Sequence, residues 1–135
     1  MSEQDVFDIL KYRIEVDARG TRWYYNSAGQ LHRENGPAVE WDNGAKRWYQ
    51  NGQLHRTDGP AIIWSDGVKE WYQNGQRHRT DGPAVEWWDG GKSWYINGKK
   101  LTETEFLAAT QPVVELTVAD VEKLVGKREI GRAHV

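Results

Sequence analysis

The chain has 135 residues, with 18 Lys and Arg against 20 Asp and Glu, a formal net charge of -2 and no Cys. The length favours a single domain, and the near-neutral charge argues against a chain-wide basic surface for nucleic acid. The absence of Cys excludes disulfides, iron–sulfur clusters, Cys-based zinc sites and cysteine nucleophiles. No apolar run approaches the roughly 18 residues of a membrane helix, and the acidic start is unlike a signal peptide, so we expect a cytoplasmic protein.

Residues 1–31 form an N-terminal segment that ends in a degenerate copy of a repeated unit. WYYN at 23–26 and GQLH at 29–32 match the later stretch from Trp48 to His55, with two residues inserted. We expect this copy to cap the array that follows, because the end units of repeat arrays are atypical.

Residues 32–100 hold three copies of a 23-residue unit, which begin at His32, His55 and His78. Gly-Pro-Ala, Trp-Tyr and Asn-Gly recur in register in all three copies. A period between about 20 and 50 residues is typical of repeat arrays. In such arrays each unit contacts mainly its neighbours.

Each unit carries two hairpin signals, which predict β structure. The first is Asn43-Gly44 and its equivalents Asp66-Gly67 and Asp89-Gly90. We interpret it as a two-residue type I′ turn, in which both residues have positive φ. A second turn follows at Asn51-Gly52, and at the matching positions of the other two units.

Pairing around the first turn places Trp41 opposite Lys46, Glu40 opposite Arg47, and Val39 opposite Trp48. Period-2 alternation then predicts one face with the Val or Ile residues, the Trp rings and the Lys stems. Ala, Tyr and the Glu40–Arg47 pair fall on the other face. The predicted tryptophan ladder consists of Trp41, Trp48, Trp64, Trp71, Trp87 and Trp94.

These features together predict a mainly β fold, an elongated antiparallel β-hairpin meander. Asp58-Gly59-Pro60 and its equivalents predict a bulge in the longer strand, because Pro lacks an N–H and Gly permits positive φ.

Residues 101–128 predict a small α/β cap of helix, strand and helix over the open sheet edge. Thr102 and Glu105 form a capping box that opens a helix ending near Ala109. Residues 112–116 predict a strand, and Thr117 caps a second helix that Gly126 stops.

We interpret residues 129–135 as sequencing-adapter read-through. One reading frame of the common adapter ATCGGAAGAGCACACGTC encodes the last six residues, IGRAHV. The natural chain would then be truncated near Arg128, and the source would be an environmental assembly.

The pattern Asn-Gly-x-x-His, a following Gly and then Asp-Gly resembles the MORN repeat (membrane occupation and recognition nexus) over about residues 12–100. The unit is longer than the usual form, and His-Arg-x-Asp-Gly-Pro-Ala replaces His-Gly-x-Gly. The form WY-x-NG-x-x-HR-x-DGPA is similar to small proteins of tailed phages and their hosts. The resemblance implies hairpin arrays that act as binding surfaces, and it implies no reaction.

The repeated polar residues favour a structural role over metal binding. Equivalent positions in successive units lie about 10 Å apart, whereas ligands of one zinc lie about 2 Å from the metal. We therefore expect no metal and no cofactor. We interpret the polar and aromatic residues that recur in the units as stabilising the repeat. We expect the His residues to lie near Trp and to form hydrogen bonds within His-Arg-x-Asp. The set consists of His32, His55, His78, Arg56, Arg79, Asp58, Asp81, Trp41, Trp64 and Trp87.

Catalysis is disfavoured because it needs one asymmetric constellation. Every candidate acid, base or donor in the units recurs, and no nucleophile elbow, phosphate loop or zinc-protease motif occurs. We expect a protein that is not an enzyme.

The aromatic residues are the main candidates for binding, although packing into a core is the competing interpretation of the Trp ladder. Trp88 is the best single candidate, because its equivalents are Asp42 and Ser65. Further candidates are Tyr49, Tyr72, Tyr95 and Arg47. Such rows can stack single-stranded bases, but Glu40, Glu70 and Glu86 on the same predicted face would repel phosphate.

The expected function is non-enzymatic binding of a host or phage protein. With the resemblance, the sharpest form is a phage-type inhibitor that occupies a host factor such as a CRISPR–Cas effector, in the host cytoplasm. One alternative is a structural, scaffolding or antitoxin-like partner protein. A further alternative is a sponge for a nucleotide or single-stranded nucleic acid.

Overall fold

The computed structural model describes residues 1–112 and 116–133, and the side chains up to residue 126. In chain order the elements are α1 (Glu3–Lys11), β1 (Arg13–Val16), β2 (Arg22–Tyr25), β3 (Val39–Glu40), β4 (Lys46–Arg47), β5 (Tyr49–Gln50), β6 (Gln53–Leu54), β7 (Ile62–Ile63), β8 (Lys69–Glu70), β9 (Tyr72–Gln73), β10 (Gln76–Arg77), β11 (Val85–Glu86), β12 (Lys92–Ile96), β13 (Lys99–Leu101), α2 (Glu103–Thr110) and α3 (Val118–Ala133).

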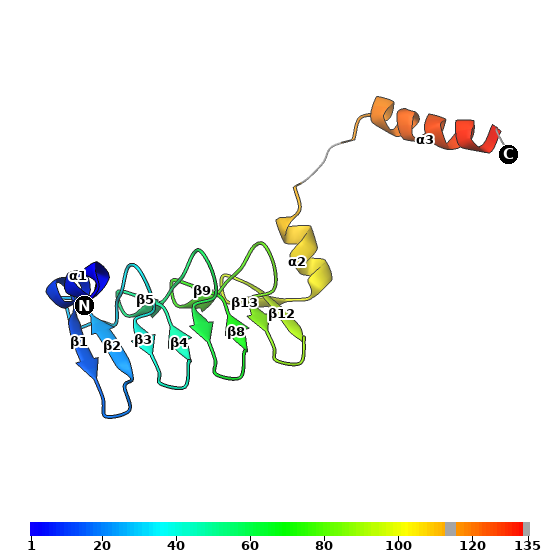
Figure 1. The fold of residues 1–135 in the computed structure, drawn as a ribbon. Helices are drawn as coiled ribbons and strands as arrows, with labels where there is room; N and C mark the ends of the chain where they lie inside the picture. Colours follow the sequence, from blue (N-terminus) through cyan, green and yellow to red (C-terminus); the bar gives the residue numbers. More distant parts are fainter. Residues whose placement is uncertain (113–115, 134–135) are drawn as a thin grey trace.

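The strands form one nine-stranded antiparallel sheet in the order β1-β2-β3-β4-β7-β8-β11-β12-β13. Two small sheets, β5-β6 and β9-β10, are hairpins that lie between consecutive hairpins of the large sheet in the sequence. Figure 1 shows the hairpins side by side in chain order, with α1 at one end of the row and α2 at the other. The mainly β hairpin meander predicted from the sequence is confirmed.

The first turn of each unit has three residues, so the predicted two-residue turn was wrong. The Trp41 N–H donates to the Ala45 carbonyl at 2.9 Å, and Glu40 pairs with Lys46. Gly44 has a φ of 91°, whereas Asn43 is not among the residues with positive φ. The Asn43 side chain instead accepts the Ala45 N–H at 3.0 Å. A three-residue loop with Gly in the left-handed region is the other common way to close a hairpin.

The second turn is of the predicted type. Asn51 and Gly52 have φ of 47° and 82°, and Gln50 pairs directly with Gln53 across them. Asn74 and Asn97 also have positive φ. Asn tolerates the left-handed region better than most residues, which explains its place in all three units.

The longer first turn moves the second strand by one residue, and such a slip exchanges its two faces. Arg47, rather than Trp48, lies on the face of Val39 and Trp41, because Arg47 is paired with Val39. The predicted ladder of six tryptophans with Lys stems over it was therefore wrong. Trp41, Trp64 and Trp87 lie on one face, and Trp48, Trp71 and Trp94 lie on the other.

Arginines rather than lysines cover the rings. The guanidinium carbon of Arg47 lies 5.3 Å from the Trp41 ring centroid and 5.0 Å from that of Trp64. On the other face, Arg56 lies 3.8 Å from the Trp48 ring centroid. Arg79 repeats this contact with Trp71 at 3.9 Å.

The degenerate first copy is shifted by one residue relative to the sequence alignment. The Tyr24 N–H donates to the Ala38 carbonyl, as the Trp48 N–H donates to that of Ala61. Arg33 lies 4.0 Å from the Tyr24 ring centroid. Tyr24, and not Trp23, therefore takes the structural place of Trp48.

The core is narrow and runs along the start of each hairpin. Ala38, Ala61 and Ala84 are fully buried, and the neighbouring Val39, Ile62 and Val85 are buried on the opposite face. The sheet is therefore covered on both faces at this point.

The loop that precedes each hairpin is held in place by an arginine, and this contact explains why the loop contains a glycine. Arg56 Nη1 donates to the Pro60 carbonyl at 3.0 Å, and a Cβ at Gly59 would lie 2.9 Å from the Arg56 guanidinium carbon. Gly59 is not among the glycines with positive φ. The segment is a loop before β7 rather than the predicted bulge in a strand, and the glycine leaves room for the close approach of the arginine.

The two ends of the sheet differ. At the N-terminal end α1 begins with a capping box between Ser2 and Asp5, which the sequence analysis did not single out. At the other end, α2 begins with the predicted capping box of Thr102 and Glu105. Phe106 of α2 is buried, 6.5 Å from Trp94 between ring centroids.

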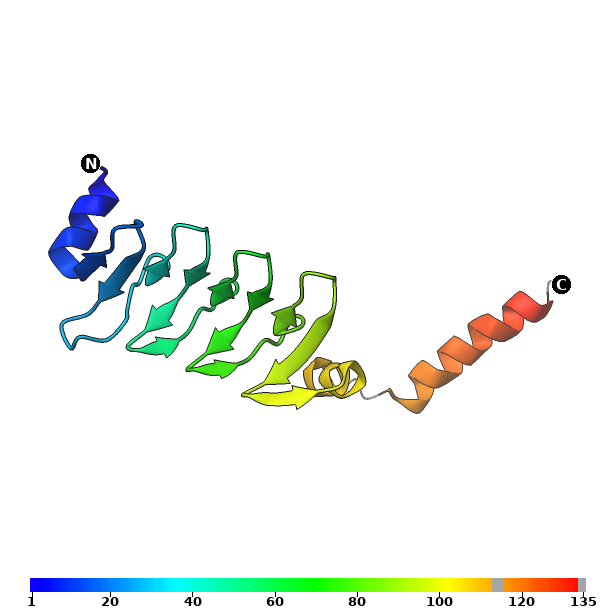
Figure 2. The same ribbon diagram turned by 90° about the horizontal axis from the view of Figure 1, so that it is seen from below.

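The tail departs from its prediction in one respect. α3 continues through Gly126 to Ala133, so the predicted stop at Gly126 was wrong. The predicted strand at 112–116 falls largely on residues 113–115, which lie outside the described residues. Figure 2 shows α3 projecting away from the sheet, and its described Val and Leu side chains are exposed. Within the described residues, no helix has the length and hydropathy to cross a bilayer.

Candidate binding surfaces

The first candidate surface is the tryptophan face, which we define as Trp41, Trp64, Trp87, Trp88 and Arg47. Trp64 is 39% exposed and Trp87 is 45% exposed, and Trp88 in the following turn is 74% exposed. A shallow pocket of about 360 Å³ lies between the first two units, lined by Trp41, Arg47 and Trp64. Apolar rings on adjacent hairpins therefore remain in contact with solvent in the folded chain.

Trp88 occupies the turn between β11 and β12. Its Asp42 and Ser65 equivalents are also exposed, so the fold does not need a ring at this position. No contact of the Trp88 ring with another aromatic ring or a cation occurs among the described residues.

A polar cluster in the second unit interrupts this face. Glu70 is buried and accepts hydrogen bonds from Trp64 Nε1 at 2.6 Å and from Arg77 Nε at 3.0 Å. The Tyr72 hydroxyl donates to the same carboxylate at 3.3 Å, and burial, with the nearby Glu70 charge, raises the pKa of Tyr72. Position 70 is Arg47 in the first unit and Ser93 in the third, so this cluster is specific to the second unit.

Arg77 was missed by the sequence analysis. Its guanidinium lies 5.9 Å from the Tyr72 ring centroid and 5.2 Å from that of Tyr95, whereas the predicted cation Arg47 lies between tryptophans. The sequence signal for Arg77 was that the equivalent position in the first unit holds the apolar Leu54. Tyr49, Tyr72 and Tyr95 are all half-buried.

The prediction that Glu40, Glu70 and Glu86 lie together on the face of the tyrosines was also wrong. Of these three, only Glu70 lies on the tryptophan face, where Arg77 neutralises it at 2.9 Å. Glu40 and Glu86 lie on the other face and pair with Arg33 at 2.7 Å and Arg79 at 3.1 Å. The one-residue shift in register moves Glu70, which is on a second strand, whereas Glu40 and Glu86 are on first strands and keep their face.

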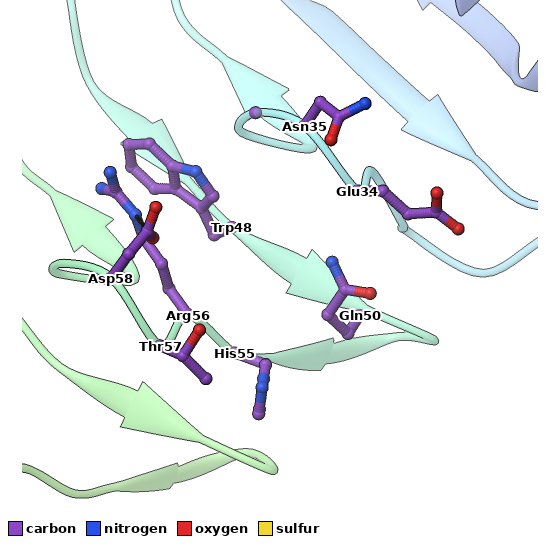
Figure 3. Close-up of a pocket in the computed structure, with 9 residues that line it drawn as sticks. Glu34, Asn35, Trp48, Gln50, His55, Arg56, Thr57 and Asp58 are labelled. Atoms are coloured by element: carbon purple, nitrogen blue, oxygen red, sulfur yellow. Dashed lines mark hydrogen bonds and ion pairs between the residues drawn. The ribbon is translucent and has the colours of Figure 1, made fainter.

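The second candidate surface is formed by the arginine loops, which we define as residues 32–37, 55–60 and 78–83. A pocket of about 600 Å³ lies between the first two loops and is shown in Figure 3. A second, of about 400 Å³, lies between the second and third loops. Trp48, His55, Arg56 and Asp58 line the first pocket, and their equivalents line the other.

Each histidine bonds to the second turn of its own unit rather than within its His-Arg-x-Asp segment. The Nδ1 atoms of His32, His55 and His78 accept the backbone N–H of the Asn nineteen residues later, at 2.9, 3.0 and 3.0 Å. The three ring nitrogens are thus engaged separately. Among the described residues, no group of three or more His, Asp or Glu side chains gathers as a metal site.

The arginines and aspartates of the loops do pair as the spacing suggests. Arg56 Nε donates to Asp58 at 2.9 Å, and Arg79 Nε donates to Asp81 at 2.7 Å. These hydrogen bonds lower the pKa of both carboxyl groups. Both aspartates are exposed, so the pairs contribute little stability individually.

Searches against protein families, curated proteins and solved structures find no match to this chain. The functional argument therefore depends on the two surfaces themselves. Both are shallow, elongated and periodic, and the chemistry that they offer is stacking, ion pairing and hydrogen bonding.

Proposed function

We propose that this protein acts without catalysis, by stoichiometric binding of another protein through the tryptophan face. The observation that carries the proposal is the exposure of Trp64, Trp87 and Trp88, from 39% to 74%, on neighbouring hairpins. Contiguous exposed apolar surface on a folded chain marks interaction sites. Trp, Tyr and Arg are also the residues that contribute most to protein interfaces.

The polar cluster around Glu70 supports the same proposal. Trp64 is held by the hydrogen bond from its Nε1 to Glu70, and Arg47 lies against Trp41 and Trp64. A ring that is already fixed loses little conformational entropy when a partner packs on it. The face is therefore partly preorganised for binding.

We further propose that the partner is a host factor and that the protein inhibits it by occupation. The support is the similarity of the units to proteins of tailed phages and their hosts, together with the MORN-like pattern. A CRISPR–Cas effector is the first partner to test. A scaffolding or antitoxin-like protein would instead bind a component encoded beside it.

The test compares four forms of the full chain: the parent, Trp88→Ala, Trp87→Ala/Trp88→Ala and the control Lys46→Ala. Lys46 is exposed and lies on the opposite face of β4 from Arg47. Each form captures proteins from lysates that carry defence systems, and the captured protein is then purified and titrated by calorimetry. We expect 1:1 binding by the parent and the control, and at least about a tenfold loss of affinity for the double variant.

Circular dichroism melting accompanies the titration, since all four forms must be equally folded. Equal affinity of the double variant and the parent would overturn the proposed site. Loss of partner activity at substoichiometric amounts of this protein would overturn the proposed mechanism, because occupation requires one molecule per target.

A further inference from the structure

The first arginine loop is already occupied by a helix of the same chain. Asp8 of α1 accepts a hydrogen bond from Arg33 Nη2 at 2.7 Å, and the Tyr12 hydroxyl accepts the Glu34 backbone N–H at 3.0 Å. Asp8 and Tyr12 are 3% and 6% exposed. They are four residues apart and so lie on one side of the helix end. The first loop therefore donates hydrogen bonds to a carboxylate, that of Asp8, and to a hydroxyl oxygen, that of Tyr12.

The same donors recur in the second and third loops without such acceptors. Arg56 uses Nε for Asp58 and Nη1 for the Pro60 carbonyl, and its Nη2 makes no hydrogen bond with the described residues. Arg79 likewise makes no Nη2 bond with them. The side chains of Arg56 and Arg79 are 22% and 19% exposed, against 11% for the covered Arg33.

A third donor points to the same ligand chemistry. Because His55 Nδ1 accepts the Asn74 N–H, the proton of its neutral ring is on Nε2. In the first loop, His32 Nε2 lies 3.7 Å from the Glu34 carboxylate, but Thr57 replaces this acid in the second loop. His55, Arg56 and Thr57 all line the larger pocket. The pocket thus gathers donors that match a carboxylate.

The acidic residues near these pockets are already paired. Asp58 is bonded to Arg56, and Glu34 is paired with Lys11 of α1. Glu86 pairs with Arg79, whereas Ile63 takes its place in the second unit. The positive charge of Arg56 is therefore balanced by one carboxylate, and that of Arg79 by two.

The distance between the two pockets indicates which secondary structure of a ligand could place one carboxylate in each. They recur every two strands, about 9.6 Å apart. Carboxylates at positions i and i+7 of an α-helix project from the same side about 10.5 Å apart. In an extended strand, residues about 10 Å apart are three positions apart and project to opposite sides.

We propose that the second and third arginine loops bind an acidic helix of a partner protein, whose carboxylates at i and i+7 enter the pockets at Arg56 and Arg79. Asp8 on Arg33 is the internal counterpart of this contact. The site is separate from the tryptophan face and does not depend on it.

The test is a titration of the full ¹⁵N-labelled chain with a helix-stapled Ala-rich peptide that carries Glu at i and i+7. One control peptide has Gln at both positions, and another has Glu at i and i+5. We expect saturable shifts of the Thr57 and Thr80 amides, with affinity at least about tenfold above that of either control. Added salt should weaken the binding.

Two protein variants locate the contact. Arg56→Gln should weaken binding about tenfold. Because Arg56 also holds its own loop, Ile63→Glu provides a second variant that keeps the arginine and supplies the acid found in the neighbouring units. It should lower the affinity by a smaller factor without unfolding the chain. Trp87→Ala/Trp88→Ala should leave peptide binding unchanged, so failure here is distinguishable from failure of the tryptophan face.

Equal binding of the Glu and Gln peptides would overturn the proposal, and so would shifts confined to the tryptophan face. Tighter binding of inorganic phosphate or single-stranded RNA than of the Glu peptide would also overturn it. That result would identify the loops as a phosphate site.

Discussion

The Nδ1 atom of His55 accepts a hydrogen bond from the backbone N–H of Asn74, nineteen residues later, at 3.0 Å. That N–H belongs to the first residue of a two-residue turn, where the hairpin ladder offers it no carbonyl partner. The same bond joins His32 to Asn51 and His78 to Asn97. Each histidine therefore fastens the second hairpin of its unit to the loop with which the same unit begins.

Removing a histidine should destabilise the chain by an amount that follows its burial. His32 is 9% exposed, and its loss leaves a partly buried N–H unpaired. We expect His32→Ala to lower the free energy of unfolding by about 1–3 kcal/mol, and the more exposed His55→Ala by about 0.5–1.5 kcal/mol. Urea denaturation measures both, with the exposed Ser27→Ala as control. Equal losses at the two sites would contradict the burial argument.

The two turns of a unit should respond differently to the same substitution. Asn74 has a φ of 51°, whereas Asp66 in the first turn is not among the positive-φ residues. Asn74→Ala should cost about 1–2 kcal/mol in unfolding free energy because of left-handed strain, and Asn74→Gly should cost much less. Asp66→Ala loses only the side-chain bond to the Val68 N–H, 3.0 Å long. It should therefore cost no more than about 1 kcal/mol.

The buried cluster of the second unit should show strong coupling. Arg77→Leu introduces the residue found at position 54 but leaves Glu70 buried without its cation. We expect it to lower the free energy of unfolding by about 3 kcal/mol. Adding Glu70→Ser, the residue at position 93, should recover most of that loss, because no buried charge then remains unpaired. A double-mutant cycle in urea measures the coupling, and additive losses would count against it.

The arginine–aspartate pairs should make stability fall in acid. Hydrogen bonding from Arg56 and Arg79 lowers the pKa of Asp58 and Asp81 from the ordinary 3.8. A depressed folded-state pKa contributes stability above the unfolded value, and that contribution disappears as pH falls through the folded value.

We therefore expect Asp58→Asn/Asp81→Asn to be less stable than the parent at pH 6, by no more than about 1 kcal/mol for each pair. The two melting curves should converge as the pH falls below 3.8 and through the lowered folded-state pKa of the aspartates. A difference that persists unchanged at pH 2 would show that the aspartates act through something other than their charge. High salt at pH 6 should reduce the difference as well.

The two C-terminal helices should contribute unequally to stability. Phe106 of α2 is 5% exposed against the last strands, whereas Val118, Val121 and Leu124 of α3 are exposed. A chain ending at Pro112 should melt at the same temperature as the full chain. One ending at Leu101 should lose roughly 3 kcal/mol, the effect of removing a buried Phe. A large loss on the first truncation would reveal a packing role for the tail.

The regular features of the units could be read from the sequence. The Asn-Gly turns place residues in the left-handed region in all three units, and the capping box of Thr102 and Glu105 opens α2. These are local devices, so a few adjacent residues determine them. The absence of Cys depends on composition alone, and the absence of the catalytic motifs depends on the order of neighbouring residues.

The register and the partners of the side chains were decided only in the tertiary structure. A dipeptide such as Asn43-Gly44 can close a loop of two or three residues, and the choice exchanges the faces of Arg47 and Trp48. In the folded sheet the turn has three residues, and Ala38 and Val39 are both buried. The contact of Asp8 with Arg33 joins positions 25 residues apart. No local sequence pattern predicts this contact, because only the folded sheet brings the helix to the first loop.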